Sequence, residues 1–359
     1  MCGSVAQVTT VIHRTKNILK QVVIRALAHP RVRTFFSPFT GCLRTVFMMH
    51  RIEDPAQGIY GHSIQFIESI LQRLRRQNYR LVSLPELIAD LNGDTPPKGH
   101  SVAFTFDDGT YDQAEIAAPL FRRYDCPATI FLITGFVDGS LWPWDDQIAY
   151  LFRHTTRTSV TIRTDSQTLS YDLRSDAQRL SAVDDLRLRC KAMAQPELLA
   201  VLDALPDAAE LTIPERAPRA YAPMSWDDAR SLERTGLFSF GPHSVSHQIL
   251  TGMSNEHARG EITGSWQRMR HELAKPLPVF NFPSGLFGTR EIEFLSDAGL
   301  SAFVTSDAGY VSSCNDRERR DFPRRLDRFV FPETLEDFLQ YSTWIEWGKT
   351  LLRPGTRNS

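Results

Sequence analysis

Short runs of β-forming residues alternate with helical patterns along most of this chain, and this order limits the possible folds more than any other feature. Apolar runs bounded by turn residues predict strands at 45–49, 101–106, 128–133, 237–240, 279–282 and 301–305. Apolar residues at helical spacing predict helices at 63–77, 83–92, 112–124, 226–235, 255–274 and 289–298. Because strands that alternate with helices are typical of parallel sheets, we predict an α/β fold.

The length of 359 residues suits one large domain with additions. Residues 155–220 break the strand and helix rhythm, because a polar Thr, Ser and Arg stretch precedes a charged, Leu-rich helical segment. We interpret 155–220 as a helical insertion within a main domain of residues 41–332. Residues 333–352 have the pattern of an amphipathic helix, so we assign 333–359 as a C-terminal helix and tail.

Residues 1–40 are expected to form a basic N-terminal arm. Residues 1–52 contain eight Lys and Arg but no Asp or Glu, whereas the whole chain has a net charge of −1. Apolar residues at helical spacing from Val8 to Ala26 predict an amphipathic helix that ends at Pro30. Such a helix either associates with an anionic membrane surface or packs on the body of the protein.

Composition argues against several classes of protein. The net charge of −1 does not suit a surface that coats nucleic acid, so we expect no nucleic-acid partner. Five cysteines without a C-x-x-C pair indicate neither a disulfide framework nor a thiolate zinc site. Without a long apolar run or a signal-peptide pattern, we expect a cytoplasmic protein or one peripheral at the inner face of a membrane. The acid-free, basic start also resembles a mitochondrial transit peptide.

The clearest chemical signal is the sequence Thr-Phe-Asp-Asp-Gly at 105–109, where an expected strand ends and a helix follows. Strand ends of this kind carry the sites of α/β barrels. Asp107 and Asp108 repel each other, so their pKa values separate unless a cation lies between them. A metal ion would supply that cation, although Asp-Gly pairs also form ordinary turns and helix caps.

A second signal follows the expected strand at 237–240, where three residues separate His243 from His247. Histidines at i and i+4 face one way across a turn of helix, which is a usual spacing for two ligands of one divalent ion. A lone histidine is more often an ordinary surface or core residue. Two histidines and one carboxylate leave a coordination position open, which is typical of a catalytic metal that acidifies bound water.

With these motifs the chain resembles the polysaccharide deacetylase family, also called the NodB-homology or carbohydrate esterase family 4 group. TFDDG at 105–109 and HSVSH at 243–247 match the first two motifs of that family. The resemblance implies a distorted (β/α)7 barrel, here with a helical insertion and an N-terminal amphipathic helix. It also implies metal-dependent removal of acetyl groups from sugars. By position it implies Asp107 as the general base and Asp108, His243 and His247 as the metal ligands.

The third motif of the family, usually Arg-x-Pro-Tyr-Gly, reads Asn-Phe-Pro-Ser-Gly in this chain. Asn281 replaces the arginine that orients the base, and Ser284 replaces the aromatic residue before the glycine. The family directs a backbone N–H at the Ser284 position toward the oxyanion, a role that does not depend on the side chain. Arg324 or Arg325, in the run FPRRLDRF, is the candidate for the missing guanidinium. Two solvated arginines near a turn are the alternative.

The departing amine needs a proton, and the family commonly places the donor histidine on a late motif. No histidine follows His271 in this sequence. One branch of exopolysaccharide deacetylases has a permuted order with a Tyr-His motif on an early strand, and the run from Val46 to Arg51 is similar to it. The resemblance therefore implies His50 as the general acid, with an ordinary strand-end cap as the alternative.

Trp144 and Asp145 lie in the run LWPWDD and are candidate substrate contacts. Tryptophan stacks on pyranose faces, and aspartate accepts hydrogen bonds from sugar hydroxyls. Buried aromatic residues that close the insertion onto the barrel are the alternative, and the run favours this interpretation slightly.

The sequence therefore predicts an N-deacetylase that acts on an N-acetylhexosamine-containing polysaccharide or lipid-linked glycan. Zinc is the expected metal, and cobalt, nickel or iron(II) would also suit two imidazoles and a carboxylate. Two other classes stay open. One is a catalytically weakened glycan-binding or scaffold protein, suggested by Asn281 and Ser284, and the other is a small-molecule amidohydrolase. A serine hydrolase is not expected, because the chain has no G-x-S-x-G elbow.

Overall fold

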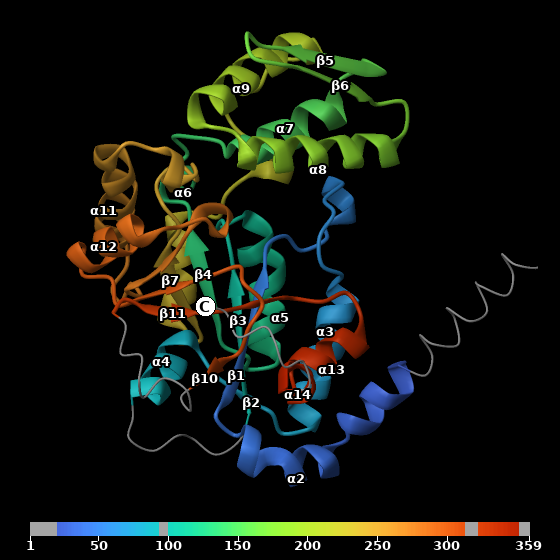
Figure 1. The fold of residues 1–359 in the computed structure, drawn as a ribbon, viewed down its shortest axis with the longest axis vertical. Coiled ribbons are helices and arrows are strands. Elements are labelled where there is room, and N and C mark those ends of the chain that lie inside the picture. Colours follow the sequence, from blue (N-terminus) through green and yellow to red (C-terminus); the bar gives the residue numbers. More distant parts are fainter. Residues whose placement is uncertain (1–19, 93–99, 313–321, 352–359) are drawn as a thin grey trace, which may run out of the picture.

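Parallel strands form the centre of the computed structural model, which describes residues 20–92, 100–312 and 322–351 (Figure 1). One run of parallel pairs joins, in this order, β1 (Leu43–Met49), β3 (Ser101–Phe106), β4 (Ala128–Leu132) and β7 (Phe238–Pro242). A second run joins β8 (Val279–Asn281), β9 (Ala302–Val304) and β11 (Arg324–Leu326). Every residue of β1, β3 and β4 is buried, as expected for parallel strands covered on both faces.

The two runs of parallel strands are linked at both of their ends. β12 (Phe329–Val330) follows β11 after two residues and pairs in parallel with β1. On the other side, the N–H of Leu277, just before β8, donates to the carbonyl of Phe240 in β7 at 2.7 Å. The strand order is that of the distorted (β/α)7 barrel expected from the sequence. Two short strands extend it, β2 (Arg80–Leu81) beside β3 and β10 (Val311–Ser312) antiparallel to β1.

Helices surround the barrel, and their sequences explain where they begin and which face they bury. The helices of the main domain are α3 (Ile64–Arg76), α4 (Leu84–Asn92), α5 (Ala118–Arg123), α6 (Thr134–Val137), α10 (Trp226–Arg234), α11 (Asn255–Glu272) and α12 (Thr289–Asp297). Single turns occur at η1 (Pro55–Gln57), η2 (Gln113–Ala117), η4 (Leu250–Gly252) and η5 (Pro283–Gly285). α3 buries residues at the spacing of one helix face, Ile67, Ile70, Leu71 and Leu74. α10 begins with a reciprocal cap between Ser225 and Asp228.

The insertion forms a separate layer over the carboxyl ends of the barrel strands (Figure 1). It contains α7 (Trp144–His154), β5 (Ser159–Arg163), β6 (Thr168–Asp172), α8 (Asp176–Ala192), α9 (Gln195–Ala209) and the turn η3 (Arg219–Tyr221). Its core runs from Trp142 to Tyr221 and is distinct from the barrel core. The prediction of a purely helical insertion was incomplete, because the polar stretch forms the antiparallel hairpin β5–β6 and α7 packs with the same layer.

The arm and the tail pack against each other at the opposite end of the barrel. Residues 20–27 are helical, and Pro30 begins a second helix, α2 (Pro30–Thr40), rather than simply following the first. The expected tail helix is two helices, α13 (Leu335–Tyr341) and α14 (Ile345–Leu351). Ile24 and Ala28 of the arm are buried with Leu339 and Ile345 of these helices. Residues 8–19 of the predicted amphipathic helix lie outside the described part.

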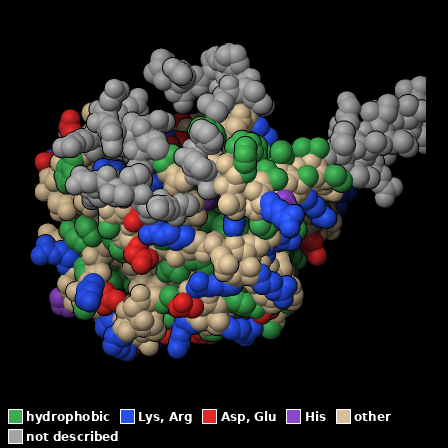
Figure 2. Space-filling model, turned by 90° about the horizontal axis from the view of Figure 1, so that it is seen from below, with side chains coloured by type: hydrophobic (Ala, Val, Ile, Leu, Met, Phe, Trp, Pro, Cys, Tyr) green, Lys and Arg blue, Asp and Glu red, His purple; other side chains and the backbone are tan. Residues whose placement is uncertain are grey.

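The described surface gives two simple observations about charge and apolarity. On the face shown in Figure 2, basic and acidic side chains are interspersed rather than gathered into a patch of one sign. Within the described residues, no helix combines the length and the apolar character that a membrane-crossing segment needs.

Candidate metal and catalytic site

Asp107 directly follows β3 and is held in place by an arginine. Its carboxylate is 3% exposed and accepts two hydrogen bonds from Arg328, Nη1 to Oδ1 at 2.7 Å and Nη2 to Oδ2 at 3.0 Å. Burial alone would raise the pKa of Asp107, but the charge of Arg328 and of nearby histidines outweighs burial and holds this pKa below its usual range. Asp107 is therefore an ionised carboxylate in a fixed orientation at neutral pH.

The arginine on Asp107 is neither of the two predicted from the sequence. Arg325 lies at the surface and pairs with Asp307 at 2.5 Å and Asp327 at 2.7 Å, and Arg324 lies at the start of β11. The assignment of Arg324 or Arg325 to the base is thus corrected to Arg328, which is four residues beyond Arg324.

Arg328 reaches the base because it lies between β11 and β12 and points into the barrel. It is 1% exposed, and it also donates to the carbonyl of Thr305 at 2.8 Å and to Oδ1 of Asn281 at 3.1 Å. Alternation with buried Leu326 could not single out this residue, because it puts Arg324 and Arg328 on the same side. Asn281, which replaces the arginine of the third motif, thus supports an arginine that comes from the loop between β11 and β12.

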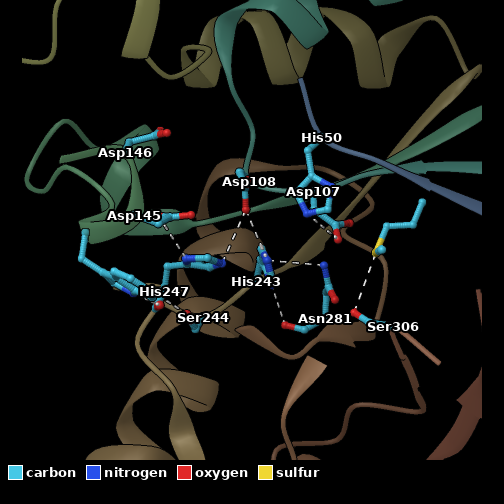
Figure 3. A network of polar contacts seen from close by, with 12 residues as sticks. His50, Asp107, Asp108, Asp145, Asp146, His243, Ser244, His247, Asn281 and Ser306 are labelled. Carbon is cyan, nitrogen blue, oxygen red and sulfur yellow. Dashed lines mark hydrogen bonds and ion pairs between the residues drawn. The ribbon is translucent and has the colours of Figure 1, made fainter. Parts of the chain in front are cut away.

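Asp108, His243 and His247 meet at one point beside Asp107 (Figure 3). Oδ1 of Asp108 lies 3.4 Å from Nε2 of His243 and 3.6 Å from Nε2 of His247. The candidate ligand atoms of the three residues all lie within 4.8 Å of one another. This Asp108 oxygen is buried and has no hydrogen-bond partner, as expected for an atom whose partner is a cation. Two imidazoles and a carboxylate fit a divalent ion such as zinc.

Both imidazoles turn the same nitrogen toward Asp108. Nδ1 of His243 lies 2.8 Å from the carbonyl oxygen of Asn281, and Nδ1 of His247 lies 3.8 Å from Oδ1 of Asp145. The carbonyl beside Nδ1 of His243 favours the tautomer that keeps the proton there and leaves Nε2 unprotonated for a metal, whereas Nδ1 of His247 has no hydrogen-bond partner among the described residues. Burial lowers the pKa of His247, whereas the carboxylates beside His243 outweigh burial and raise its pKa.

The loop after β7 carries the two histidines, and it is not the helical turn that their spacing suggested. Ser244 and His247 both have positive φ, +64° and +59°, which is left-handed backbone and not a turn of right-handed helix. Glu261 of α11 accepts hydrogen bonds from the N–H groups of Val245 at 2.9 Å and Ser246 at 2.8 Å. The carboxylate of Glu261 therefore fixes the loop that positions both imidazoles.

His50 directly follows β1 and lies on the other side of Asp107 (Figure 3). Its Nε2 lies 3.8 Å from Oδ2 of Asp107, and 49% of its side chain is exposed. Gln113, in the π turn η2, donates to the carbonyl of His50 at 2.8 Å and to the carbonyl of Asp107. This amide ties the ends of β1 and β3 together and sets the distance between the two side chains. The role of His50 as a proton donor stays a prediction.

Of the remaining predicted contacts, Trp144 is wrong as a sugar-stacking residue. It is 5% exposed in the core of the insertion, and its Nε1 donates to the carbonyl of His247 at 3.3 Å. Asp145 faces His247, as described above, so the structure places it next to a candidate metal ligand (Figure 3). Ser284 lies in η5, directly after β8, with a positive φ of +57°.

Comparison with known proteins identifies one family. A family model described as polysaccharide deacetylase matches residues 94–180 and 191–303, and the gap between them falls within α8. No curated protein matches the chain.

Solved structures are similar in fold. The deacetylase PplD of Streptococcus pyogenes, in complex with acetate, is 17% identical over 84% of this chain and 98% of its own, with a TM-score of 0.54. IcaB from Ammonifex degensii is 15% identical over 84% of this chain and 97% of its own, with a TM-score of 0.53. A de-N-acetylase from Aggregatibacter actinomycetemcomitans is 14% identical over 83% and 99%, with a TM-score of 0.51. At these identities the likeness concerns the fold.

Proposed function

This chain belongs to the polysaccharide deacetylase family and is a hydrolase of carbon–nitrogen bonds, and we propose that it removes N-acetyl groups from an N-acetylhexosamine-containing polysaccharide or lipid-linked glycan with the help of a divalent metal. One observation carries the proposal. A carboxylate held ionised by Arg328 lies directly beside the cluster of Asp108, His243 and His247. Base and metal ligands are the two parts that activation of water for amide hydrolysis requires.

In the proposed reaction each group of the chain has one task. Asp108, His243 and His247 would hold the metal, which polarises the acetyl carbonyl and lowers the pKa of water when it is bound. Asp107 accepts the proton of the attacking water, while Arg328 keeps its carboxylate in place. The backbone N–H at Ser284 donates to the oxyanion, and His50 gives a proton to the departing amine, so that acetate and a free amino sugar result.

The identity of the metal is a finer part of the proposal. The buried, unpartnered Oδ1 of Asp108 and two imidazole nitrogens suit zinc, and the same ligand set accepts cobalt, nickel or iron(II). Metal analysis of the purified protein, followed by reconstitution of the metal-free form with each ion, distinguishes these possibilities.

The proposal is tested by acetate release from chito-oligosaccharides and from lipid-linked glycans with the zinc-loaded protein. Asp107→Asn removes the base and is expected to lower kcat by about 10²- to 10⁴-fold. Asp203→Asn, at an exposed position of α9, is the matched control and is expected to retain wild-type kcat. Absence of acetate release by metal-loaded wild-type protein on every substrate would contradict the proposal.

The same acetate-release experiment distinguishes the two alternative functions. A weakened glycan-binding protein was suggested by the loss of the motif arginine at Asn281, but Arg328 occupies that place on Asp107 and supports a working base. A small-molecule amidohydrolase would release acetate from N-acetylated monosaccharides and simple amides in preference to oligosaccharides.

We further propose that residues 1–40 bring the protein to the inner, anionic face of a membrane in the cytoplasm. Support comes from the eight basic and no acidic residues within 1–52. Liposome flotation tests it best with charge-neutral variants, because residues 20–40 pack on the tail and deletion would uncover apolar surface. The proposal of membrane association would be overturned if the triple variant Arg14→Gln/Lys16→Gln/Lys20→Gln bound anionic liposomes as well as the wild type does.

A further inference from the structure

A cavity of about 570 Å³ lies between the insertion and the segment that follows β1. Its walls come from α7, α8 and η3 of the insertion and from η1 and its neighbours in the main domain. Figure 1 shows these two parts of the chain facing each other beside the carboxyl ends of the strands. The candidate metal ligands and Asp107 are not among the lining residues, so this is a second concave region and not the site described above.

Arginine dominates the charge of this cavity. The charged lining residues are Arg51, Arg153, Arg179, Arg187 and Arg219 on the basic side and Asp146 and Asp176 on the acidic side. Burial and the neighbouring charge of Asp145 raise the pKa of Asp146 to about 7. This excess of positive charge differs from the mixed surface of Figure 2.

Two of these arginines have no carboxylate partner among the described residues. Arg179 donates to the carbonyls of Phe152 at 2.5 Å and Thr155 at 3.1 Å, which does not neutralise its charge. Arg153 lies 5.1 Å from the ring centre of Tyr60, and its Nε is buried without a hydrogen-bond partner. By contrast, Arg51, Arg187 and Arg219 form ion pairs. Two guanidinium charges in one cavity wall that no carboxylate neutralises favour an anionic partner.

The cavity adjoins the candidate active site through two pairs of neighbours in the sequence. His50 lies beside Asp107, and the next residue, Arg51, lines the cavity. Asp145 faces His247, and the next residue, Asp146, lines the cavity. The walls of the two regions are therefore continuous along the backbone at Arg51 and at Asp146.

Aromatic rings complete the wall next to the arginines. Tyr150 lies 5.8 Å from Tyr221, ring centre to ring centre, and both line the cavity, as does Tyr60, which is 64% exposed. Flat aromatic faces beside guanidinium groups suit a sugar ring that carries a charged substituent.

We propose that this cavity binds an anionic substituent, a phosphoryl or carboxylate group, on the part of the glycan that adjoins the N-acetylated sugar. Arg153 is the residue on which the proposal depends most, because it lines the cavity next to Tyr60 and no carboxylate among the described residues neutralises its charge. The proposal rests on the proposed deacetylase function and deepens it, since it makes the substrate an acidic glycan and not a neutral one.

The test compares kcat/KM for acidic substrates with kcat/KM for a neutral substrate, in the zinc-loaded full-length protein and its variants. We measure kcat/KM for acetate release from a neutral chito-oligosaccharide and from matched oligosaccharides that carry either a phosphate or a uronate. The wild type is expected to prefer an anionic substrate, and Arg153→Gln is expected to reduce that preference by about tenfold to hundredfold, mainly through KM. Arg153→Lys should restore part of it. Arg157→Gln is the matched control, because Arg157 is exposed on the same insertion, pairs with Glu210 and does not line the cavity.

A binding measurement separates this proposal from the deacetylase function. Titration calorimetry with inorganic pyrophosphate and with glucuronate is expected to show binding to the wild type and weaker binding to Arg153→Gln, and the tighter probe identifies the substituent. Binding of this kind without acetate release from any substrate would support the anion site and overturn the deacetylase function. Acetate release with equal kcat/KM for neutral and acidic substrates, together with no binding of either probe, would overturn the anion site alone.

Discussion

Arg328 and Asp107 form a buried ion pair whose side chains are 1% and 4% exposed. A complete buried pair adds little to stability, but removal of one partner leaves an uncompensated charge. We therefore expect Arg328→Met to lower the free energy of unfolding by about 3–5 kcal/mol, measured by chemical denaturation. The double variant Arg328→Met/Asp107→Asn contains neither charge and is expected to regain most of this loss. Equal losses in the single and double variants would show that Arg328 acts through packing alone.

Arg325 gives the matched control for this pair. Its side chain is 46% exposed, and it pairs with Asp307 and Asp327 at the surface, where solvent weakens such interactions. Arg325→Met is therefore expected to change the free energy of unfolding by less than about 1 kcal/mol.

His100 makes stability depend on pH. Its Nε2 lies 2.8 Å from Oγ1 of Thr45, and burial together with the charges of Arg33 and Arg44 lowers its pKa to about 3. The unfolded chain, with a histidine pKa of roughly 6.5, binds a proton that the folded chain does not bind between these two values. Stability from this residue is thus present above pH 6.5 and is lost as the pH falls.

The size of this pH effect follows from the difference between the pKa of His100 in the folded and in the unfolded chain. From pH 7 to pH 5 the wild type should lose about 2 kcal/mol more of its free energy of unfolding than His100→Gln does. Denaturation curves at the two pH values measure it, and parallel losses in both proteins would show that His100 is protonated in the folded state.

At the scale of elements, the sequence predicted regular structure well and the site loops poorly. The predicted strand 101–106 coincides with β3, and 255–274 ends two residues beyond α11, because apolar periodicity directly reports burial. The spacing of His243 and His247 is the same in a loop and in a helix, so it could not reveal the left-handed backbone at Ser244 and His247. The residues that hold this loop come from elsewhere in the sequence.

Glu261 shows how one element positions another. Besides the two N–H groups of the histidine loop, it accepts the hydroxyl of Ser246 at 2.7 Å. We expect Glu261→Ala to free the loop and lower zinc affinity by about tenfold to hundredfold, the usual effect of losing a group that orients metal ligands. Competition with a chromogenic chelator measures the affinity.

The control for Glu261 is on the same helix. Glu256→Ala changes an exposed residue in the first turn of α11 and is expected to leave zinc affinity unchanged. Equal affinities of Glu261→Ala and Glu256→Ala would show that the loop holds its shape without Glu261.

At the scale of the whole molecule, the candidate site lies at one end of the barrel, and the arm and tail helices pack at the other. The insertion covers the carboxyl ends of the strands, where the site lies, whereas the arm and the tail helices pack at the other end (Figure 1). The sequence indicated both additions by composition, but it could not indicate where they dock. Arg25, for instance, pairs with Glu336 at 2.5 Å across most of the length of the chain. Contacts between such distant segments leave no periodic signal.

This separation predicts that the arm can be released without loss of activity. Ile24 is 4% exposed against α13 and α14, whereas its neighbour Val23 is 46% exposed on the same helix. Ile24→Asp buries an unpaired charge and is expected to undock residues 20–40, which would make them susceptible to limited proteolysis and lower the melting temperature. Val23→Asp adds the same charge at the surface and should do neither. Acetate release is expected to match the wild type in both variants, and its loss in Ile24→Asp alone would mean that docking of the arm is coupled to the distant site.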